Sequence, residues 1–312
     1  MSYFIAPNEA IPTGIMRVAG EQTGKAIGAM EYWQDDERVI HKVRKHLKKL
    51  RALMRLMRDE IGEEEYKRHN VFYRDLGREL SDVRDVTSLL EILETLKEKF
   101  GDSVKAQTFE PLEELLGEER TRLKAQQLEK GDRMEHVKEE LEQSAERFEQ
   151  IPISSDCWEE MVSSVRRVYK RGYKGFQESL EQPTTETMHE WRKRVKYLWY
   201  HNRLLRHAWY RIFQSFRRET KQLSDILGDY HDYALLKAQL IQVHDQLPAQ
   251  TIQATDAFAT KQQEVLLERA YLLGQRVYAE SPKAFEHRLE HYLDAWRRER
   301  EMVKPEKQVE VI

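Results

Sequence analysis

The 312-residue sequence has few of the residues that crosslink or interrupt a chain: one cysteine, 8 prolines and 13 glycines. Because Cys157 is the only cysteine, an internal disulfide and a cysteine-rich metal site are both excluded. No apolar stretch approaches the roughly 20 residues that a membrane span requires. The first residues also lack the basic and apolar regions of a signal peptide. These absences predict a soluble, cytoplasmic protein that has no contact with a membrane.

Good helix formers are abundant instead. Charged residues make up 34% of the chain and hydrophobic residues 40%, with a mean hydropathy of −0.79. Apolar residues recur at spacings of three and four, which is the helical period. The pattern predicts an all-α protein with helices near residues 9–32, 37–60, 63–100, 108–148, 157–180, 187–210, 212–245 and 253–301.

Residues 40–58, IHKVRKHLKKLRALMRLMR, contain no carboxylate at all. They hold eight arginines and lysines and two histidines, although the whole chain has 52 basic against 55 acidic residues. Solvated helices usually mix both signs, because opposite charges three or four residues apart stabilise them. The undiluted positive charge indicates an anionic ligand; the alternative is an ordinary solvated helix face.

The basic stretch recurs without gaps at residues 188–206, MHEWRKRVKYLWYHNRLLR. Further along, LSDVRD at 80–85 corresponds to LGDYHD at 227–232. An internal duplication of this size predicts two similar halves, each of about four helices. We place the two halves at residues 1–152 and 153–312.

Each copy of the basic stretch carries two stripes along its helix. The apolar seam, suited to packing inside a bundle, consists of Ile40, Val43, Leu47, Leu50, Met54 and Met57 in the first copy and Met188, Trp191, Val195, Leu198, Asn202 and Leu205 in the second. Successive residues are about 100° apart around a helix. The positions that directly follow the seam residues therefore form a second stripe beside the apolar seam, and this stripe is basic. Arginine and lysine held in a row on a rigid helix suit a polyanion.

The repeated motif H-x-x-R-K-x-x-K, at residues 41–48 and 189–196, is followed in each half by L-x-D-x-x-D. Together these motifs resemble the CHAD domain, the conserved histidine α-helical domain, over residues 10–300. The resemblance implies two four-helix bundles that are related by pseudo-two-fold symmetry, with a basic groove or pore between them. It also implies non-catalytic binding of inorganic polyphosphate and association with polyphosphate granules.

The residues that match the family's motifs are the candidate ligands of polyphosphate. They are His41, Arg44, Lys45, Lys48, Arg51, Arg55, His189, Arg192, Lys193, Lys196 and Arg203. The segment RRVYKRGYK at 166–174 resembles the basic helix that precedes the second motif in the family, and it adds Arg166, Lys170 and Arg171. Trp199 stands where the first stripe has Arg51, so we expect the two halves to contribute unequally.

The roles of the histidines and aspartates stay open at this point. Each histidine either donates a hydrogen bond to phosphate or only bonds a neighbouring helix. The motif aspartates Asp82, Asp85, Asp229 and Asp232 either position arginines of the basic stripe or form interhelical ion pairs unrelated to a ligand.

Two other functions use the same charge. A nucleic-acid-binding protein could stack bases on Tyr197, Trp199 and Tyr200, although the sequence pI of about 6.5 is low for such a protein, so nucleic acid is an unlikely partner. An adaptor could dock an acidic protein, or self-associate through the acidic segment 101–150. We predict no cofactor, no metal ligand, no catalytic residue and no enzymatic activity. The near P-loop GEQTGKA (20–26) has one residue too few between its glycines. HRLEH (287–291) fits the zinc-protease pattern H-x-x-E-H, but it lies in a highly charged helix near the end of the sequence and no third ligand is apparent.

Overall fold

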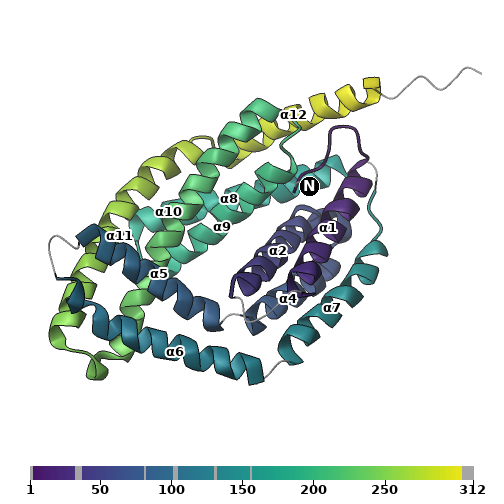
Figure 1. Ribbon diagram of the computed structural model, residues 1–312. Helices are drawn as coiled ribbons and strands as arrows, with labels where there is room; N and C mark the ends of the chain where they lie inside the picture. Colours follow the sequence, from purple (N-terminus) through teal and green to yellow (C-terminus); the bar gives the residue numbers. More distant parts are fainter. Residues whose placement is uncertain are drawn as a thin grey trace, which may run out of the picture.

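The computed structural model describes residues 3–31, 37–80, 82–100, 105–129, 132–154 and 157–303 (Figure 1). Within these ranges the chain is helical and contains no β-strand, so the predicted all-α class is confirmed. The helices are α1 (Ile11–Glu31), α2 (Glu37–Leu56), α3 (Arg58–Ile61), α4 (Glu63–Glu79), α5 (Asp82–Phe100), α6 (Glu110–Glu129), α7 (Asp132–Glu149), α8 (Trp158–Glu181), α9 (Thr185–Leu204), α10 (Tyr210–Gln242), α11 (Ala249–Val277) and α12 (Pro282–Val303), with short 3₁₀ turns at Ala106–Thr108 and His244–Gln246.

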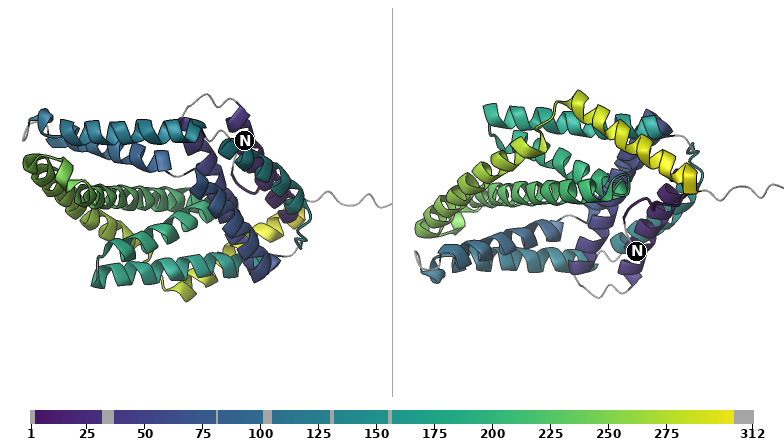
Figure 2. Two further views of the ribbon diagram at one scale, coloured as in Figure 1. Left: turned by 90° about the horizontal axis from the view of Figure 1, so that it is seen from below. Right: turned by 90° about the horizontal axis from the view of Figure 1, so that it is seen from above.

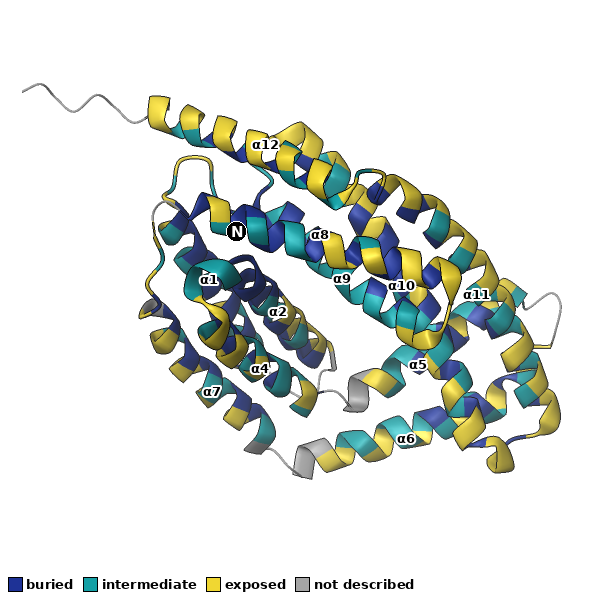
Figure 3. Ribbon diagram, turned by 180° about the vertical axis from the view of Figure 1, so that it is seen from behind, coloured by how far each residue is buried: buried dark blue, intermediate teal, exposed yellow. Residues whose placement is uncertain are grey.

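Both predicted apolar seams are buried. No residue of either seam is more than 3% exposed, and Trp191 is fully enclosed. The first seam packs α2 against α1 and α4, and the second packs α9 against α8 and α10. The two helices of the basic stretches also contact each other. In Figure 3 the inward faces of α2 and α8 are dark, whereas the outer faces of α11 and α12 are exposed.

The helices α1, α2, α4 and α7 pack together, and α8, α9, α10 and α11 form a second group (Figures 1 and 2). The predicted division at residue 152 stays a prediction, and helix packing crosses it. Although α5 and α6 belong to the first half of the sequence, α5 lies against α10 and α11. The rings of Phe100 and Phe258 stack there with centroids 4.2 Å apart.

The predicted helix 37–60 continues in the structure as α2 followed by the short α3, and three longer predicted helices are each two helices. The first, 63–100, is divided into α4 and α5 next to Leu80, and 108–148 is divided into α6 and α7. The third, 253–301, is interrupted after Val277. There the Ser281 hydroxyl accepts a hydrogen bond from the Ala284 amide at 3.2 Å, and Pro282 is the first helical residue. Serine before proline is a helix-start signal, so this interruption was readable from the sequence.

None of the helices in the described ranges combines the length and the apolar composition needed to cross a membrane.

Candidate anion-binding site

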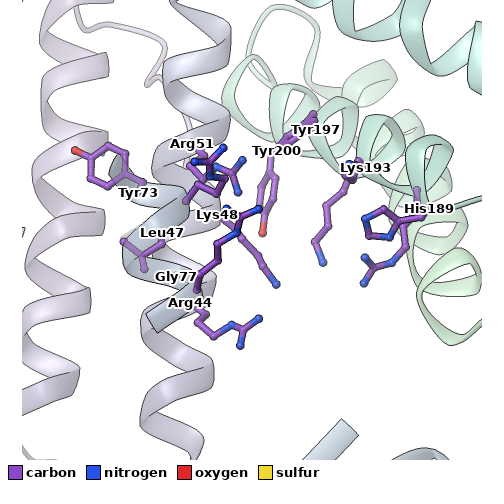
Figure 4. Close-up of a pocket in the computed structure, with 14 residues that line it drawn as sticks. Arg44, Leu47, Lys48, Arg51, Tyr73, Gly77, His189, Lys193, Tyr197 and Tyr200 are labelled. Atoms are coloured by element: carbon purple, nitrogen blue, oxygen red, sulfur yellow. The ribbon is translucent and has the colours of Figure 1, made fainter. Parts of the chain in front are cut away.

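A pocket of about 390 Å³ opens between α2, α4 and α9 (Figure 4). Helix α2 contributes Arg44, Leu47, Lys48 and Arg51; α4 contributes Tyr73, Arg74, Gly77 and Arg78; and α9 contributes His189, Arg192, Lys193, Lys196, Tyr197 and Tyr200. Cations and a histidine therefore dominate the lining, and it includes no Asp or Glu from the described part of the chain.

The helical period explains why these side chains meet. Residues three, four or seven positions apart share one helix face, which places Arg44, Lys48 and Arg51 together on α2. The same spacing places Arg192 and Lys196 together on α9. Because α2 and α9 contact each other, equivalent positions of the predicted duplication face the same space. In Figure 4 Lys48 and Lys193 extend toward that space from opposite sides.

Desolvation and, to a smaller extent, the nearby positive charges lower the basicity of two pocket lysines. Lys48 remains accessible to solvent, but the surrounding protein removes part of the water around its ammonium group. This desolvation lowers the pKa of Lys48 to about 7, and repulsion from Lys196, Arg44 and Arg192 adds to the effect. Burial and repulsion from Arg192 likewise lower the pKa of Lys196 to about 8. The protein groups around these two lysines therefore stabilise their protonated forms less well than water does.

Aspartates of the L-x-D-x-x-D motifs lie near two of the pocket arginines, Arg44 and Arg192. One Nη of Arg44 is 3.7 Å from Asp85, and the other donates to the Leu80 carbonyl at 3.1 Å. Burial lowers the pKa of Arg192, and attraction to Asp232 and Asp229 opposes that shift. These contacts support a positioning role for the aspartates. The Asp82 side chain lies outside the described residues.

The two motif histidines occupy different environments. His189 lines the pocket and lies beside His231, with ring centroids 4.6 Å apart. Burial lowers the pKa of both rings, that of His231 to about 4. The buried Nδ1 of His189 has no hydrogen-bond partner within the part of the chain that the structure describes. His41 is exposed on α2 and does not line the pocket.

Half of the predicted polyphosphate ligands line this pocket, and the other half lie elsewhere. Those outside it are His41, Lys45, Arg55, Arg166, Lys170, Arg171 and Arg203. Arg55 is 9% exposed and donates to the Tyr66 hydroxyl at 2.5 Å and to Asn70 at 3.1 Å. Their participation in binding stays a prediction.

Two of the outlying arginines have partners of their own. Arg166 forms an ion pair with Glu286 at 2.9 Å, and Arg203 lies over the rings of Tyr3 and Trp199. Both side chains are therefore already engaged with the protein.

Helix α4 supplies pocket residues that the motifs did not indicate, among them Tyr73, Arg74 and Arg78. Arg74 pairs with Asp75 through two hydrogen bonds of 2.8 and 3.0 Å. The duplication could have indicated Arg74, because it aligns Arg74 with Lys221. Lys221 is also a cation, and repulsion from it contributes to the lowered pKa of Lys196.

No cluster of three or more His, Cys, Asp or Glu that could hold a metal ion occurs in the described ranges. His287 and His291 do approach each other on α12, with ring centroids 4.5 Å apart.

Comparison with known proteins gives one family and two related folds. The family model for the CHAD domain matches residues 18–241. The structure of PptA from Streptomyces chartreusis superposes with a TM-score of 0.62 at 13% identity, covering 85% of this chain and 98% of that one. The CHAD domain from the plant Ricinus communis superposes with a TM-score of 0.54 at 16% identity, covering 88% of this chain and 93% of that one. No curated protein matches the sequence.

Proposed function

The chain belongs to the CHAD domain family, and we propose that it binds inorganic polyphosphate, without catalysis, in the pocket between α2, α4 and α9. The observation that carries the proposal is the pocket lining, in which eight arginines and lysines converge from three helices without an Asp or Glu among the described lining residues. Carboxylates outside the lining pair with only some of these cations, as Asp75 does with Arg74 and Glu190 with Lys193. Arginine offers phosphate oxygens a planar fork of donors, and lysine adds a point charge beside it.

The depressed lysine pKa values support an anion as the ligand. Lys48 and Lys196 lose basicity because they lie close to other cations in a partly desolvated space. A polyanion in the pocket would supply the missing negative charge and restore the ordinary preference of both lysines for the protonated state.

The aromatic side chains near the pocket favour polyphosphate over single-stranded nucleic acid. Base stacking requires accessible ring faces, but Trp191 is fully buried and Tyr200 is 2% exposed. The guanidinium of Arg55 covers the ring of Tyr197 at 3.9 Å from its centroid. A ligand without bases uses the cations and needs none of these rings.

The direct test is a competition experiment. Labelled long-chain polyphosphate is bound at about physiological ionic strength, where weak surface attraction is screened, and single-stranded DNA of equal charge is added. We expect DNA to leave the complex intact. Displacement by an equal charge of DNA would refute selectivity for polyphosphate and favour the nucleic-acid function.

Reversing the charge of two pocket arginines tests whether polyphosphate binds in this pocket. The variant Arg44→Glu/Arg192→Glu should lose about 100-fold or more in affinity, because each reversal removes a charged donor and adds a repulsive carboxylate. The matched control is Lys174→Glu/Arg211→Glu, which changes the charge equally at two exposed positions outside the pocket. Circular dichroism should show both variants to be helical. An equal loss in the control would mean that overall charge, and not the pocket, governs binding.

The proposal also implies a cellular location, in the cytoplasm at polyphosphate granules. A fluorescent fusion should overlap granules stained for polyphosphate, and the Arg44→Glu/Arg192→Glu variant should be diffuse. A diffuse wild-type protein in granule-containing cells would contradict this part of the proposal.

A further inference from the structure

A second cationic cavity lies where α2 and α3 meet α8 and α9. Its lining consists of Arg55, Arg58, Ser164, Arg167, Val168, Arg171 and Arg194. None of these is among the residues that line the polyphosphate pocket. The open volume is about 10 Å³, which is the space of about one water molecule.

The charges around this cavity are not balanced. Three of its five arginines have a carboxylate partner outside the lining: Arg167 with Asp59 at 2.5 Å, Arg58 with Glu63 at 2.5 Å, and Arg194 with Glu190 at 3.0 Å. Among the described residues, Arg55 donates hydrogen bonds to the neutral partners Tyr66 and Asn70 and to no carboxylate. Arg171 is exposed and forms no ion pair within the described ranges. Two of the five arginines therefore have no carboxylate partner in the described part of the chain.

The arginines also repel one another across the cavity. Burial lowers the pKa of Arg194, and repulsion from Arg171 and Arg55 lowers it further. Repulsion between like charges in a partly buried space is costly unless a counter-ion lies between them.

Two buried donors at this cavity are unsatisfied. Ser164 is 2% exposed, and its hydroxyl has no hydrogen-bond partner among the described residues. The Nε of Arg55 is likewise buried and without a partner in the described part of the chain. Buried donors are normally paired, so both point to a missing acceptor.

We propose that this cavity binds a single small inorganic anion of the size of chloride. The anion accepts hydrogen bonds from the Ser164 hydroxyl and from arginine N–H groups and neutralises part of the excess charge. A phosphate group carries four oxygens around its phosphorus and exceeds a space of about one water molecule. The site is therefore distinct from the polyphosphate pocket in both size and ligand.

The position of the cavity gives the anion a structural consequence. Helices α2 and α3 belong to the first half of the sequence, and α8 and α9 to the second. Because α3 packs on α8 and α2 on α9, an anion here joins the two halves. A ligand that binds only the folded state stabilises it, so chloride should raise the melting temperature.

Bromide is the probe for locating the anion. Crystals grown with bromide in place of chloride should show an anomalous-scattering peak between Ser164, Arg55 and Arg194. Crystals of Ser164→Val, in which the added methyl groups fill the space, should lack it. A wild-type crystal with no anomalous peak in the cavity would overturn the proposal.

Thermal unfolding gives the solution test. At constant ionic strength, replacing gluconate by chloride should raise the wild-type Tm by about 2–4 °C. The increase should fall by half or more in Ser164→Ala, which removes one donor, and in Arg171→Gln, which removes an exposed charge. The control Lys174→Gln changes the same charge on α8 outside the cavity and should retain the full increase.

Two solution outcomes would overturn the proposal: a Tm insensitive to the identity of the anion, or an unchanged chloride effect in both cavity variants. Neither outcome depends on the proposed function, because Ser164 lies outside the polyphosphate pocket. Loss of the chloride effect in Ser164→Ala together with intact polyphosphate binding would show that the two sites are separate.

Discussion

Arg44 and Arg192 occupy equivalent positions of the predicted duplication, but the helices opposite them differ. In the first half, α4 ends at Glu79, and the Leu80 carbonyl accepts a hydrogen bond from Arg44. In the second half, α10 runs unbroken through Leu227, the equivalent of Leu80. Arg192 lies there beside Gly228, where a Cβ would be 3.8 Å from its Nε.

Because of this difference, the two equivalent arginines use their hydrogen-bond donors differently. A helix end leaves carbonyl groups without intrahelical partners, and Arg44 uses a donor to satisfy one of them. The continuous helix α10 offers Arg192 no such carbonyl, and the Nε of Arg192 has no partner in the described structure. We therefore expect Arg192 to have more donor capacity for a ligand than Arg44.

The largest expected effect compares the two arginines directly. Arg192→Gln should weaken polyphosphate binding by about 30-fold, within the range of a charged hydrogen bond. Arg44→Gln should weaken it by only about 5-fold, because its donors are shared with the Leu80 carbonyl and Asp85. Titration calorimetry measures both. Equal losses would mean that the broken helix does not restrain Arg44.

The second prediction compares a buried and an exposed cation of α2. Arg55→Met should reduce the free energy of unfolding by about 2 kcal/mol, because two hydrogen bonds and a ring contact are lost. Lys45→Met, an exposed position on the same helix, should change it by less than about 0.5 kcal/mol. Urea denaturation gives both values. A comparable effect at Lys45 would contradict the view that Arg55 mainly joins helices.

The third prediction concerns pH. Polyphosphate favours protonated Lys48, whose pKa of about 7 lies well below the ordinary value for lysine. Binding must therefore take up protons, and affinity should fall by about 10-fold between pH 6 and pH 8 as Lys48 loses its charge in the free protein. Lys48→Arg stays charged throughout and should flatten the profile. A wild-type affinity independent of pH would refute the coupling.

The smallest expected effect tests the continuous helix. Gly228→Ala should stabilise the protein by about 0.5–1 kcal/mol, because alanine favours a helix interior over glycine. The added Cβ meets Arg192 only at ordinary contact distance, so polyphosphate affinity should change less than about 3-fold. Thermal and urea unfolding report the stability. A destabilised variant with a large loss of affinity would show that Arg192 needs closer access to the α10 backbone.

Several features of the structure could be predicted from local sequence patterns. The helical period identified both apolar seams because it reports which face of a helix is buried, and every seam residue is buried as predicted. The motif spacing also identified the α2 and α9 cations that line the pocket, among them Arg44 and Arg192. These properties depend on residues within a few turns of one another.

Tertiary packing decided which side chains of the basic stripes meet in the pocket. Arg51 and Arg55 are one turn apart in the same stripe, yet Arg51 lines the pocket and Arg55 contacts Tyr66 and Tyr197. The contribution of α4 and the packing of α5 on α10 likewise join residues distant in sequence. By itself the sequence determined the helices, their buried faces and the basic stripes, because these follow from local spacing and charge. Only the tertiary structure decided which cations share a pocket, since that depends on which helix covers each end of a stripe.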